Sequence, residues 1–440
     1  MPADFDTIVN LAKKRGFVFQ SSEIYGGIRS AYDYGPLGAE LLRNVKDQWW
    51  RSMVQLRDDV VGIDSAVIQS PKVWVASGHL ASFSDPLVEC RECHNRFRLD
   101  KLESPDQCPS CGSKGSFTEP REFNLMFRTH MGPIESEDNA VYLRPETAQG
   151  IFINFENVRR TARKRLPFGI AQVGKSFRNE ITPGQFVFRT REFEQMEMEF
   201  FCHPDEAEEW YRYWVDERRN WYIDLGITEQ NLQFREHDED ELSHYSTGTF
   251  DVDYLFPWGW DELEGIANRT DFDLTQHQKF SGKDLTYFDD ETKERFLPHV
   301  IEPSGGVDRA TLAFLCEAYC EDEAPDEKGV LQQRIVMKLH PRFAPIKVAV
   351  FPLVKKEGMP EVARKIYADI QSAGLACFYD EKGAVGRRYR RQDEAGTPFC
   401  VTVDGQTLQD QTLTIRDRDS LTQDRIPAEK VVEYVKSRIL

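Results

Sequence analysis

Charged and aromatic side chains between residues 178 and 197 have types and spacing that suit a ligand pocket. Arg178 and Glu180 stand two apart, and Arg189, Phe193 and Glu197 follow at intervals of four. Residues two apart in an extended chain share a face, so Arg178 and Glu180 point the same way. A surface hairpin whose charges pair with one another would explain an isolated Arg-x-Glu, but the complete pattern favours one pocket.

Two strands joined by a basic loop are expected to position these side chains. The segment 168–177 (FGIAQVGKSF) is strand-like, and so is 192–201 (EFEQMEMEFF) after the loop 181–191. Alternation in the second strand puts Phe193, Gln195 and Glu197 on one face and Met196, Met198 and Phe200 on the other. The apolar face predicts core, whereas buried glutamine and glutamate beside phenylalanine require a ligand or water.

A second candidate binding segment lies at 302–309 (EPSGGVDR). Gly305 and Gly306 let the backbone approach a ligand closely. A helix is expected to follow, because Leu312, Leu315 and Tyr319 recur at helical spacing. Arg309 opens that helix.

A long helix with one apolar face is expected near the N-terminus. Pro36 suits its first turn. Apolar residues repeat every four positions along it: Leu37, Leu41, Val45, Trp49 and Met53. A strand is expected to run from Val60 towards Pro71.

These three segments resemble the signature motifs of class II aminoacyl-tRNA synthetases, and the implied reaction explains the residue types. Amino-acid activation is an in-line attack of a carboxylate on the α-phosphate of ATP, so two anions meet while negative charge develops. A positioned arginine screens this repulsion and stabilises the transition state. In the family the first motif builds the dimer interface, although a buried helix in a monomer explains its apolar stripe equally well.

The resemblance assigns parts of the nucleotide to particular residues. Arg178 would contact the α-phosphate, and Glu180 would accept a hydrogen bond from the adenine amino group. Phe193 and Arg309 would pack on the two faces of adenine, with Arg309 also at the γ-phosphate. The distal phosphates would be reached by one of two loop arginines, Arg189 or Arg191.

Three strings narrow the resemblance to the homodimeric glycyl-tRNA synthetases: 143–150 (LRPETAQG), 264–269 (EGIANR) and 302–306 (EPSGG). The similarity covers essentially the whole chain and implies ATP, glycine and tRNA(Gly) as substrates. The substrate ammonium would be surrounded by Glu146, Glu197, Glu302 and Ser304. Arg178 would hold the glycine carboxylate, and Arg98 and Arg269 would lie at or beside the amino acid. Glu262 would face ATP and Mg²⁺, which prefers oxygen ligands.

Carried over to neighbouring positions, the resemblance implies two complete residue sets. The expected ATP site comprises Arg178, Asn179, Glu180, Phe188, Arg189, Thr190, Arg191, Glu192, Phe193, Glu262, Leu263, Gly306, Val307, Asp308 and Arg309. The expected glycine site comprises Arg98, Glu146, Phe193, Glu194, Gln195, Met196, Glu197, Arg269, Glu302, Pro303, Ser304, Gly305 and Gly306. The expected catalytic residues are Arg178 and Arg309.

A physical argument also favours glycine. Because glycine has no side chain to grip, selectivity must come from rejecting larger amino acids. Close-packed carboxylates satisfy the ammonium and fill the space of a Cβ. Exclusion by size is the easy direction of discrimination, so no editing site is needed.

Four cysteines predict a structural zinc site. Cys90-x-x-Cys93 and Cys108-x-x-Cys111 are separated by fourteen residues, just short of the usual window for paired zinc knuckles. Four thiolates favour tetrahedral Zn²⁺ with no open position, so the metal is expected to be structural. The alternative is four reduced thiols in a loop. Arg98 lies between the two pairs, so the insertion would also help to close the glycine pocket.

The composition bears on the compartment, on membrane insertion and on the kind of partner expected. The 440 residues carry nine cysteines, an odd number, and begin without a signal peptide, which indicates a reducing compartment and predicts a cytoplasmic protein. No apolar run approaches the length of a membrane span. The net charge of −18 argues against a nucleic-acid partner, but a tRNA contact can be local.

Two basic clusters are candidates for that contact. The first is Arg159, Arg160, Arg163, Lys164 and Arg165, which suits either tRNA or a helix C-terminus. The second is Arg387, Arg388, Arg390 and Arg391, for which tRNA binding is favoured, because the family uses its C-terminal domain for tRNA.

The expected fold is α+β. Residues 1–340 would form a class II catalytic domain around an antiparallel sheet, with a four-cysteine zinc ribbon at about 88–120 and a helical insertion at about 203–250. A β-α-β-α-β pattern at 345–440 predicts a mostly parallel α/β anticodon-binding domain.

Three functions compete. The leading one is an ATP- and Mg²⁺-dependent glycine–tRNA ligase. The second is a class II ligase for another small amino acid such as serine, which the three-glutamate set and the lack of an editing insertion oppose. The third is a non-catalytic paralogue that binds nucleic acid, but such relatives typically lose the ATP-site residues.

Overall fold

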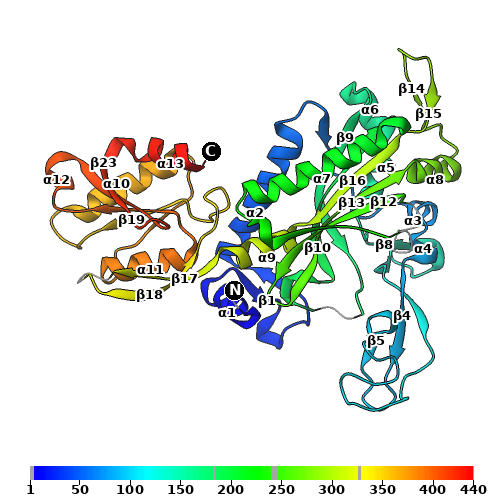
Figure 1. Cartoon of the computed structure of the whole chain (residues 1–440), viewed down its shortest axis with the longest axis horizontal. Coiled ribbons are helices and arrows are strands. Elements are labelled where there is room, and N and C mark those ends of the chain that lie inside the picture. Colours follow the sequence, from blue (N-terminus) through cyan, green and yellow to red (C-terminus); the bar gives the residue numbers. More distant parts are fainter. Residues whose placement is uncertain (1–3, 182–183, 239–245, 326–328, 440) are drawn as a thin grey trace.

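A seven-stranded sheet forms the centre of the larger part of the molecule (Figure 1). All neighbouring strands are antiparallel except β3 and β9. In spatial order the strands are β11 (Leu232–Glu236), β12 (Gly248–Phe256), β13 (Gly259–Thr270), β16 (His299–Gly306), β10 (Glu192–Cys202), β9 (Phe168–Phe177) and β3 (Val60–Gly62). This computed structural model describes residues 4–181, 184–238, 246–325 and 329–439.

The two faces of the sheet differ in chemistry, as the alternation in β10 predicts. Met196, Met198 and Phe200 are fully buried in the main hydrophobic core. Helices α7 (Ala207–Asp224) and α9 (Val307–Ala318) are among the helices that contribute to that core. The opposite face carries polar side chains and forms the floor of the candidate site.

Helix α2 (Pro36–Trp50) confirms the predicted apolar stripe. Leu41, Val45 and Trp49 are fully buried. Gly38 allows a close approach, because a Cβ there would stand 1.8 Å from the carbonyl oxygen of Phe17. A π-helical turn, Arg51–Gln55, continues the helix.

The predicted strand from Val60 towards Pro71 is wrong in length. β3 comprises only Val60–Gly62, which pairs with β9 at the edge of the sheet. Beyond Gly62 the chain leaves that edge, and a helix begins at Pro71. The N–H of Ile63 still donates to Ala171 of β9, and although β9 continues to Phe177 the chain then turns away from it, so the ladder ends.

Shorter elements surround the sheet. The helices are α1 (Phe5–Arg15), α3 (Pro71–Ala76), α4 (His79–Ser82), α5 (Ala148–Phe152), α6 (Phe155–Ala162) and α8 (Phe272–Ser281). The strand pairs are β1 (Val18–Gln20) with β2 (Tyr32–Tyr34), β7 (Arg128–His130) with β8 (Ala140–Tyr142), and β14 (Tyr287–Phe288) with β15 (Arg295–Phe296). None of the described helices is long and apolar enough to cross a membrane.

A small lobe extends away from the sheet (Figure 1). It contains a three-stranded sheet in the order β5-β4-β6. The strands are β4 (Ser84–Glu89), β5 (Arg96–Arg98) and β6 (Arg121–Asn124), and the four motif cysteines lie in the loops that follow β4 and β5.

The segment 203–250, predicted as a helical insertion, has mixed structure. It contains α7, but it also contains β11 and the start of β12. Both strands belong to the central sheet, so this part of the chain completes the sheet and covers it.

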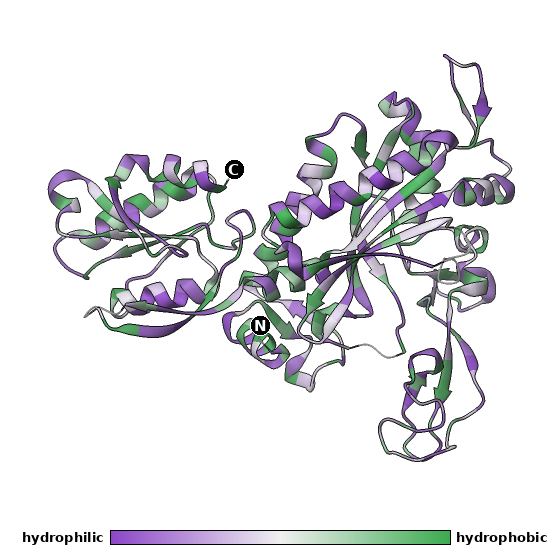
Figure 2. Cartoon of the chain, viewed as in Figure 1, coloured by the Kyte–Doolittle hydropathy of each residue, from purple (hydrophilic) through white to green (hydrophobic). Residues whose placement is uncertain are grey.

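The C-terminal domain has a five-stranded sheet in the order β20-β19-β21-β22-β23. The strands are β19 (Val348–Pro352), β20 (Cys377–Tyr379), β21 (Phe399–Val403), β22 (Thr412–Asp417) and β23 (Gln423–Pro427), and the helices are α10 (Met359–Ser372), α11 (Val385–Ala395), α12 (Thr407–Asp410) and α13 (Val431–Ile439). β20, β19 and β21 are parallel as predicted, whereas β22 and β23 add an antiparallel edge that the prediction missed. Figure 2 shows that the helices of this domain carry both apolar and polar residues along their length.

A hairpin joins the two parts of the molecule. Helix α9 runs directly into β17 (Tyr319–Pro325), which pairs with β18 (Leu331–Met337). Arg334 on β18 forms a buried ion pair of 3.1 Å with Asp393 of α11. Helix α1 also reaches α11, where Arg15 Nε donates a 2.6 Å hydrogen bond to Glu394.

Candidate functional site

The register of the central sheet aligns a polar row across its exposed face. Residues that pair directly across antiparallel strands share a face. The row runs from β11 to β9 through Arg235, Asp251, Gly265, Ser304, Glu197 and Gln172. At its centre, Gly265 leaves space above the sheet, since only Asp251 Oδ1 lies within 4 Å of the position of a Cβ.

A cavity of about 330 Å³ opens over this row. Its lining residues come from the strands of the sheet, from the loops beside them and from the start of α9: Glu146, Arg178, Glu180, Val187, Phe188, Arg189, Thr190, Phe193, Gln195, Glu197, His237, Thr249, Asp251, Glu262, Gly265, Ala267, Arg269, Glu302, Ser304, Gly305, Gly306, Asp308 and Arg309. A cavity of this size suits a small-molecule ligand.

Four arginines line this cavity, and Arg178 and Arg309 reach it from different elements. Arg178 follows β9, and its Nε donates a 3.0 Å hydrogen bond to the carbonyl of Pro145. Its guanidinium carbon lies 5.4 Å from the centre of the Phe193 ring. The structure therefore brings together the arginine and the phenylalanine of the first predicted segment.

Arg309 lies in the first turn of α9. Its guanidinium stacks on Phe188 at 4.4 Å and pairs with Glu262 at 3.3 Å. The pKa of Glu262 is lowered, chiefly by the charge of Arg309. Burial acts in the opposite direction, and Arg178 and Arg189 lower the pKa further. The Glu262 carboxylate is ionised and half exposed, so its oxygens remain accessible in the cavity.

Three carboxyl groups, Glu146, Glu197 and Glu302, gather at the other end of the cavity. Glu197 accepts hydrogen bonds from Thr147 and from Ser304, the latter at 2.6 Å. Glu302 accepts a 2.6 Å hydrogen bond from Nη1 of Arg269. These partners fix both carboxyl groups in place.

The third carboxyl group, Glu146, belongs to a buried polar network. It lies 3.3 Å from His79 Nε2 and accepts a 3.0 Å hydrogen bond from Gln149. His277 forms a 2.8 Å hydrogen bond with Gln149, and Arg269 is anchored by Asp273. Both histidines have the hydrogen-bonded structural setting that is typical of buried histidine.

The carboxyl groups compete for negative charge. Burial raises the pKa of Glu302 to about 8, although Arg269 opposes the shift. Burial and the charge of Glu146 raise the pKa of Glu197. For Glu146, burial would raise the pKa, but His79 and Arg269 together hold it well below its usual range. A cation placed among the three groups would relieve this repulsion.

Several predicted site residues do not line the cavity. Met196, Leu263, Pro303 and Val307 are buried, and three of them belong to the main core. Two others are engaged elsewhere: Glu192 pairs with Lys175 and Glu194 with Lys46. These residues contribute backbone or support near the site rather than side chains on its wall.

Three more predicted residues lie close to the cavity but outside its lining. Arg191 Nε donates a 3.2 Å hydrogen bond to the carbonyl of Glu180. Asn179 donates its backbone N–H to the carbonyl of Leu125. Arg98, on β5 of the lobe, forms a 3.0 Å ion pair with Asp85.

The cavity also contains polar residues that we did not predict from the sequence. His237 Nε2 lies 2.7 Å from Asp251 Oδ2, and Thr249 lines the wall beside them. The alternation in 248–256 (GTFDVDYLF) was the available signal, since it places Thr249 and Asp251 on one face.

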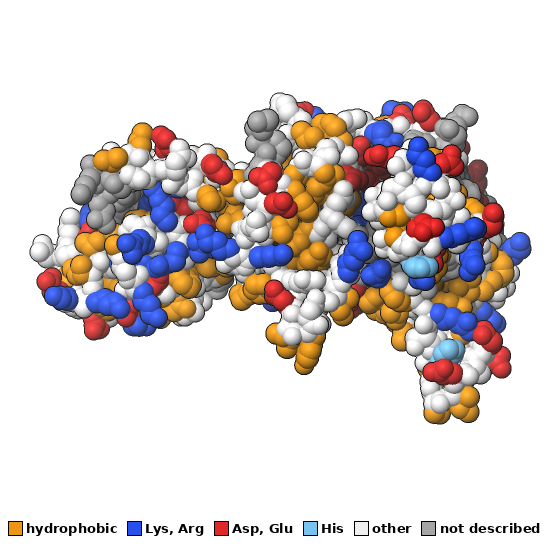
Figure 3. Space-filling view, turned by 90° about the horizontal axis from the view of Figure 1, so that it is seen from below, with side chains coloured by type: hydrophobic (Ala, Val, Ile, Leu, Met, Phe, Trp, Pro, Cys, Tyr) orange, Lys and Arg blue, Asp and Glu red, His pale blue; other side chains and the backbone are white. Residues whose placement is uncertain are grey.

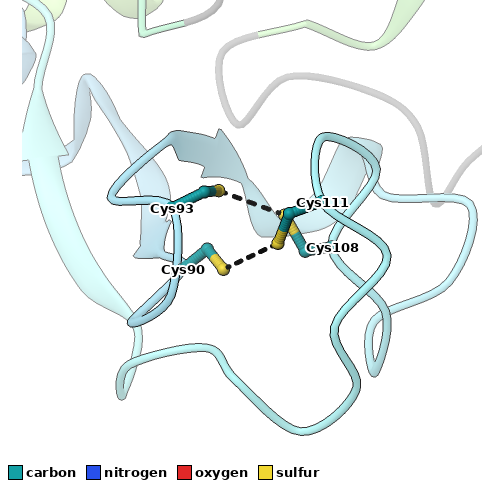
Figure 4. A group of neighbouring side chains, drawn as sticks. All are labelled: Cys90, Cys93, Cys108 and Cys111. Carbon is teal, nitrogen blue, oxygen red and sulfur yellow. Dashed lines mark hydrogen bonds between the residues drawn. The ribbon is translucent and has the colours of Figure 1, made fainter.

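The four cysteines of the lobe converge as a zinc site requires (Figure 4). Their sulfur atoms lie within 4.8 Å of one another, with Cys90 and Cys111 3.7 Å apart and Cys93 and Cys108 3.6 Å apart. Zn–S bonds of about 2.3 Å in a tetrahedron give sulfur separations of about 3.8 Å. The donor set therefore fits Zn²⁺.

Both cysteine pairs have the same local turn. The N–H of His94 donates to the carbonyl of Cys90, and the N–H of Gly112 donates to the carbonyl of Cys108. Each donor residue has a positive φ, 56° and 76° respectively. The backbone thus presents two matching knuckles.

The second basic cluster is largely committed to internal contacts. Arg388 is buried and donates to the carbonyls of Pro352 and Leu353, so its predicted role in tRNA contact is corrected to a structural one. Arg391 pairs with Asp380 at 2.5 Å. Arg388 points inward where α11 packs, whereas Arg387 is exposed and the Arg391 side chain keeps 41% of its surface exposed.

Fold and site together define the catalytic core of a class II aminoacyl-tRNA synthetase: an antiparallel sheet with a cavity over its polar face, lined by Arg178 from the loop after β9 and by Arg309 from α9. The tRNA synthetase class II core domain (G, H, P, S and T) matches residues 127–319. An anticodon binding domain matches residues 347–438.

Curated relatives specify the family. A glycine–tRNA ligase of Thermobifida fusca is 56% identical over 99% of this chain and 98% of its own length. One from Streptomyces coelicolor is 55% identical over 100% of both chains, and one from Bifidobacterium longum is 55% identical over 99% of this chain and 92% of its own. The chain belongs to the glycine–tRNA ligase family.

Proposed function

We propose that this protein activates glycine with ATP to glycyl-adenylate, releasing pyrophosphate, and then transfers glycine to the terminal ribose of tRNA(Gly). One observation carries the proposal: two arginines, Arg178 and Arg309, share a cavity with the carboxyl groups of Glu146, Glu197 and Glu302. A triphosphate and an ammonium have the complementary charges. The glycine–tRNA ligases that match the whole chain support this function.

In this mechanism the arginines compensate charge as the adenylate forms. Arg178, oriented by the carbonyl of Pro145, contacts the α-phosphate and the attacking carboxylate of glycine. That carboxylate is already ionised, so the first step needs no general base. The bond from the glycine oxygen to the α-phosphorus forms as pyrophosphate leaves.

The remaining nucleotide contacts follow from the cavity wall. Phe193 and Arg309 hold adenine between them, Glu180 accepts from its amino group, and Arg189 reaches the distal phosphates. Mg²⁺ bound at the half-exposed Glu262 would neutralise part of the triphosphate charge.

Glycine selectivity arises from the carboxylate end of the cavity. Glu146, Glu197 and Glu302 receive the ammonium. Ser304 holds Glu197 in place, and Arg269 holds Glu302. Side chains this close leave no room for a Cβ, so alanine and serine are excluded by size.

Pyrophosphate exchange tests the proposal against both alternatives. Purified protein should exchange labelled pyrophosphate into ATP with glycine and not with serine or alanine. Arg178→Ala should lower the rate by about 100-fold or more, the size expected for a charge-stabilising group. Exchange with serine would favour a serine ligase. No exchange with any amino acid, together with tRNA binding, would indicate a non-catalytic paralogue.

We also propose that the protein works as a homodimer. Exposed apolar side chains support this: Ile24, Tyr25 and Ile28 lie in the loop between β1 and β2, and Met131 and Ile134 lie in the loop between β7 and β8. Figure 3 shows apolar patches over the body of the molecule. Exposed patches of this kind mark interaction surfaces. Sedimentation velocity should give twice the mass of one 51.0 kDa chain.

The division of labour between the two domains is part of the proposal. Residues 1–340 act as the catalytic domain, with a Zn²⁺-bound ribbon at about 88–120, and residues 345–440 recognise the anticodon. Lys and Arg side chains gather on the face of the C-terminal domain seen in Figure 3, which suits the tRNA backbone. The free cysteines agree with the cytoplasmic location expected from the sequence.

A further inference from the structure

A fourth glutamate, Glu199, lies next to the carboxyl groups of Glu197 and Glu302. It follows Glu197 by two residues on β10 and therefore shares its face of the sheet. Oxygen atoms of Glu197, Glu199 and Glu302 lie within 4.8 Å of one another. Glu199 is fully buried and does not line the cavity, so its side chain lies behind the residues that form the cavity wall.

The carboxyl group of Glu199 has an unusual setting. Neither of its oxygens has a hydrogen-bond partner in the part of the chain that the structure describes. The residue paired with it on β9 is Ile170, which is apolar and buried. An ionised carboxylate without donors in such a place would be very costly, whereas a neutral acid is tolerated.

The charged groups around Glu199 favour its neutral form. Burial is the main reason that its pKa is raised well above the usual range, and Glu302 on β16 adds to this. Glu197 on the same strand and Asp273 on α8 act in the same direction. Arg269 on β13 acts against them.

A neutral carboxyl group has one O–H to donate, and Glu302 is a nearby acceptor. Glu302 Oε2 already accepts from Arg269, which fixes one side of the group. A second donor, from Glu199, would fix the other side of the Glu302 carboxyl group. An ionised Glu302 could then face an ammonium without a further negative charge beside it.

We propose that Glu199 is a positioning residue of the ammonium pocket, which keeps its proton and donates it in a hydrogen bond to ionised Glu302. The inference rests on the proposed function of the cavity. When glycine enters, Glu302 releases its proton to solvent. Arg269 and Glu199 then donate hydrogen bonds to the Glu302 carboxylate from two sides. Glu199 thus stabilises the ionised form of Glu302 without touching the substrate.

Two substitutions separate the possible roles of Glu199. Glu199→Gln keeps a donor of similar shape but can never carry a charge, and Glu199→Leu removes the donor. The Michaelis constants for glycine and for ATP are measured by pyrophosphate exchange between pH 6 and pH 9. Glu208→Gln, an exposed change on α7, is the control.

We expect Glu199→Gln to stay within about threefold of the wild type in KM for glycine. We expect Glu199→Leu to raise this KM by about 10- to 100-fold, the loss of one hydrogen bond to a charged group, with the KM for ATP unchanged. The leucine variant should also shift the pH dependence of KM for glycine to higher pH, because ionised Glu302 loses its donor.

Other outcomes would overturn the inference. If Glu199→Gln weakens glycine binding as much as Glu199→Leu, Glu199 acts as a charge. If Glu199→Leu keeps the wild-type KM and pH profile, the group only fills space. Infrared difference spectra keep the test valid if the leucine variant does not fold, since the C=O band of a protonated acid must disappear in Glu199→Gln. Wild-type protein without glycine-dependent exchange would instead remove the proposed function itself.

Discussion

The carboxyl group of Glu302 stands between a cation, Arg269, and two other carboxyl groups, Glu146 and Glu197. Burial and like charges favour its protonated form, and the buried arginine favours its ionised form. A substrate ammonium changes this balance, because it adds a positive charge where the negative charges compete. We therefore expect the pocket to bind best a ligand that brings a compact cation and little else.

Glycine binding should release protons near neutral pH. In the free protein the pKa of Glu302 is raised to about 8, so at pH 7 the group is largely protonated. A bound ammonium favours the carboxylate, so the proton leaves and glycine affinity rises as pH increases from 6 towards 8, by at most about tenfold per pH unit. Calorimetry in buffers of different ionisation enthalpy measures the released protons. Binding at pH 7 with no proton release would contradict this role of Glu302.

Removing the Glu302 side chain should relax the choice of amino acid. Glu302→Ala opens the space that a Cβ needs, so alanine should gain relative to glycine by about tenfold or more in kcat/KM. Glycine itself should bind more weakly, because one ammonium ligand is lost. Pyrophosphate exchange with each amino acid measures the ratio. A glycine-to-alanine ratio equal to that of the wild type would show that another group excludes the Cβ.

At the scale of strands and helices, the predictions that the structure confirms are those that rest on a local repeat in the sequence. Strict alternation in β10 separates Met196 and Met198 from Glu197, and the structure confirms these faces. Periodicity likewise locates α2 and α9. Such patterns are local, so the sequence alone is enough to read them.

Features that depend on distant partners could not be read in this way. β3 ends at Gly62 because the chain leaves its partner strand there, not because its residues disfavour a strand. Arg388 looks like a tRNA contact in sequence, yet three backbone carbonyls hold it inside the domain. His237 reaches the cavity only because β11 joins the sheet beside Asp251.

The zinc lobe should depend on its metal for stability, while the chemistry of activation should not. Cys108→Ser removes one of four ligands, so the protein should lose its zinc and the backbone of residues 84–124 should exchange hydrogen faster. The pyrophosphate exchange rate should remain within about tenfold of the wild type, since a closed four-thiolate site offers no position to substrate. Metal analysis and hydrogen exchange provide the measurements.

The matched control for the zinc experiment is Cys377→Ser. Cys377 is a partly buried free cysteine on β20, far from the lobe in sequence. This variant should keep its zinc. Equal zinc content in both variants would show that the four sulfur atoms do not form the site.

Over the whole molecule, one continuous path joins the cavity to the C-terminal domain. Helix α9 begins at the cavity with Arg309 and runs without a break into β17. The β17–β18 hairpin then presents Arg334 to Asp393, which also accepts from Arg416 on β22. This buried pair fixes the orientation of the C-terminal domain relative to the catalytic helix.

Weakening this junction should affect tRNA charging more than activation. Asp393→Asn removes the carboxylate that pairs with Arg416 and one of the two that pair with Arg334, which keeps Asp322, and breaking a buried pair typically costs about 3–5 kcal/mol. We expect glycine-dependent pyrophosphate exchange within about threefold of the wild type, and charging of tRNA lowered by about tenfold or more, because the two ends of the tRNA are no longer held in register. Steady-state assays of both steps provide the comparison.

Glu433→Gln serves as the control for the junction variant, because its exposed pair with Lys430 lies on α13 and should contribute little. A parallel loss of exchange and charging in Asp393→Asn would show that the junction supports the fold as a whole. It would then have no specific role in presenting tRNA.

The most direct measurement is a crystal structure of the protein with a non-hydrolysable glycyl-adenylate analogue. We predict that the glycyl ammonium lies within hydrogen-bonding distance of at least two of Glu146, Glu197 and Glu302. Arg178 should contact the group that replaces the α-phosphate, with adenine between Phe193 and Arg309. An analogue bound with its ammonium in solvent, or with its adenine among the carboxyl groups, would contradict the proposed mechanism.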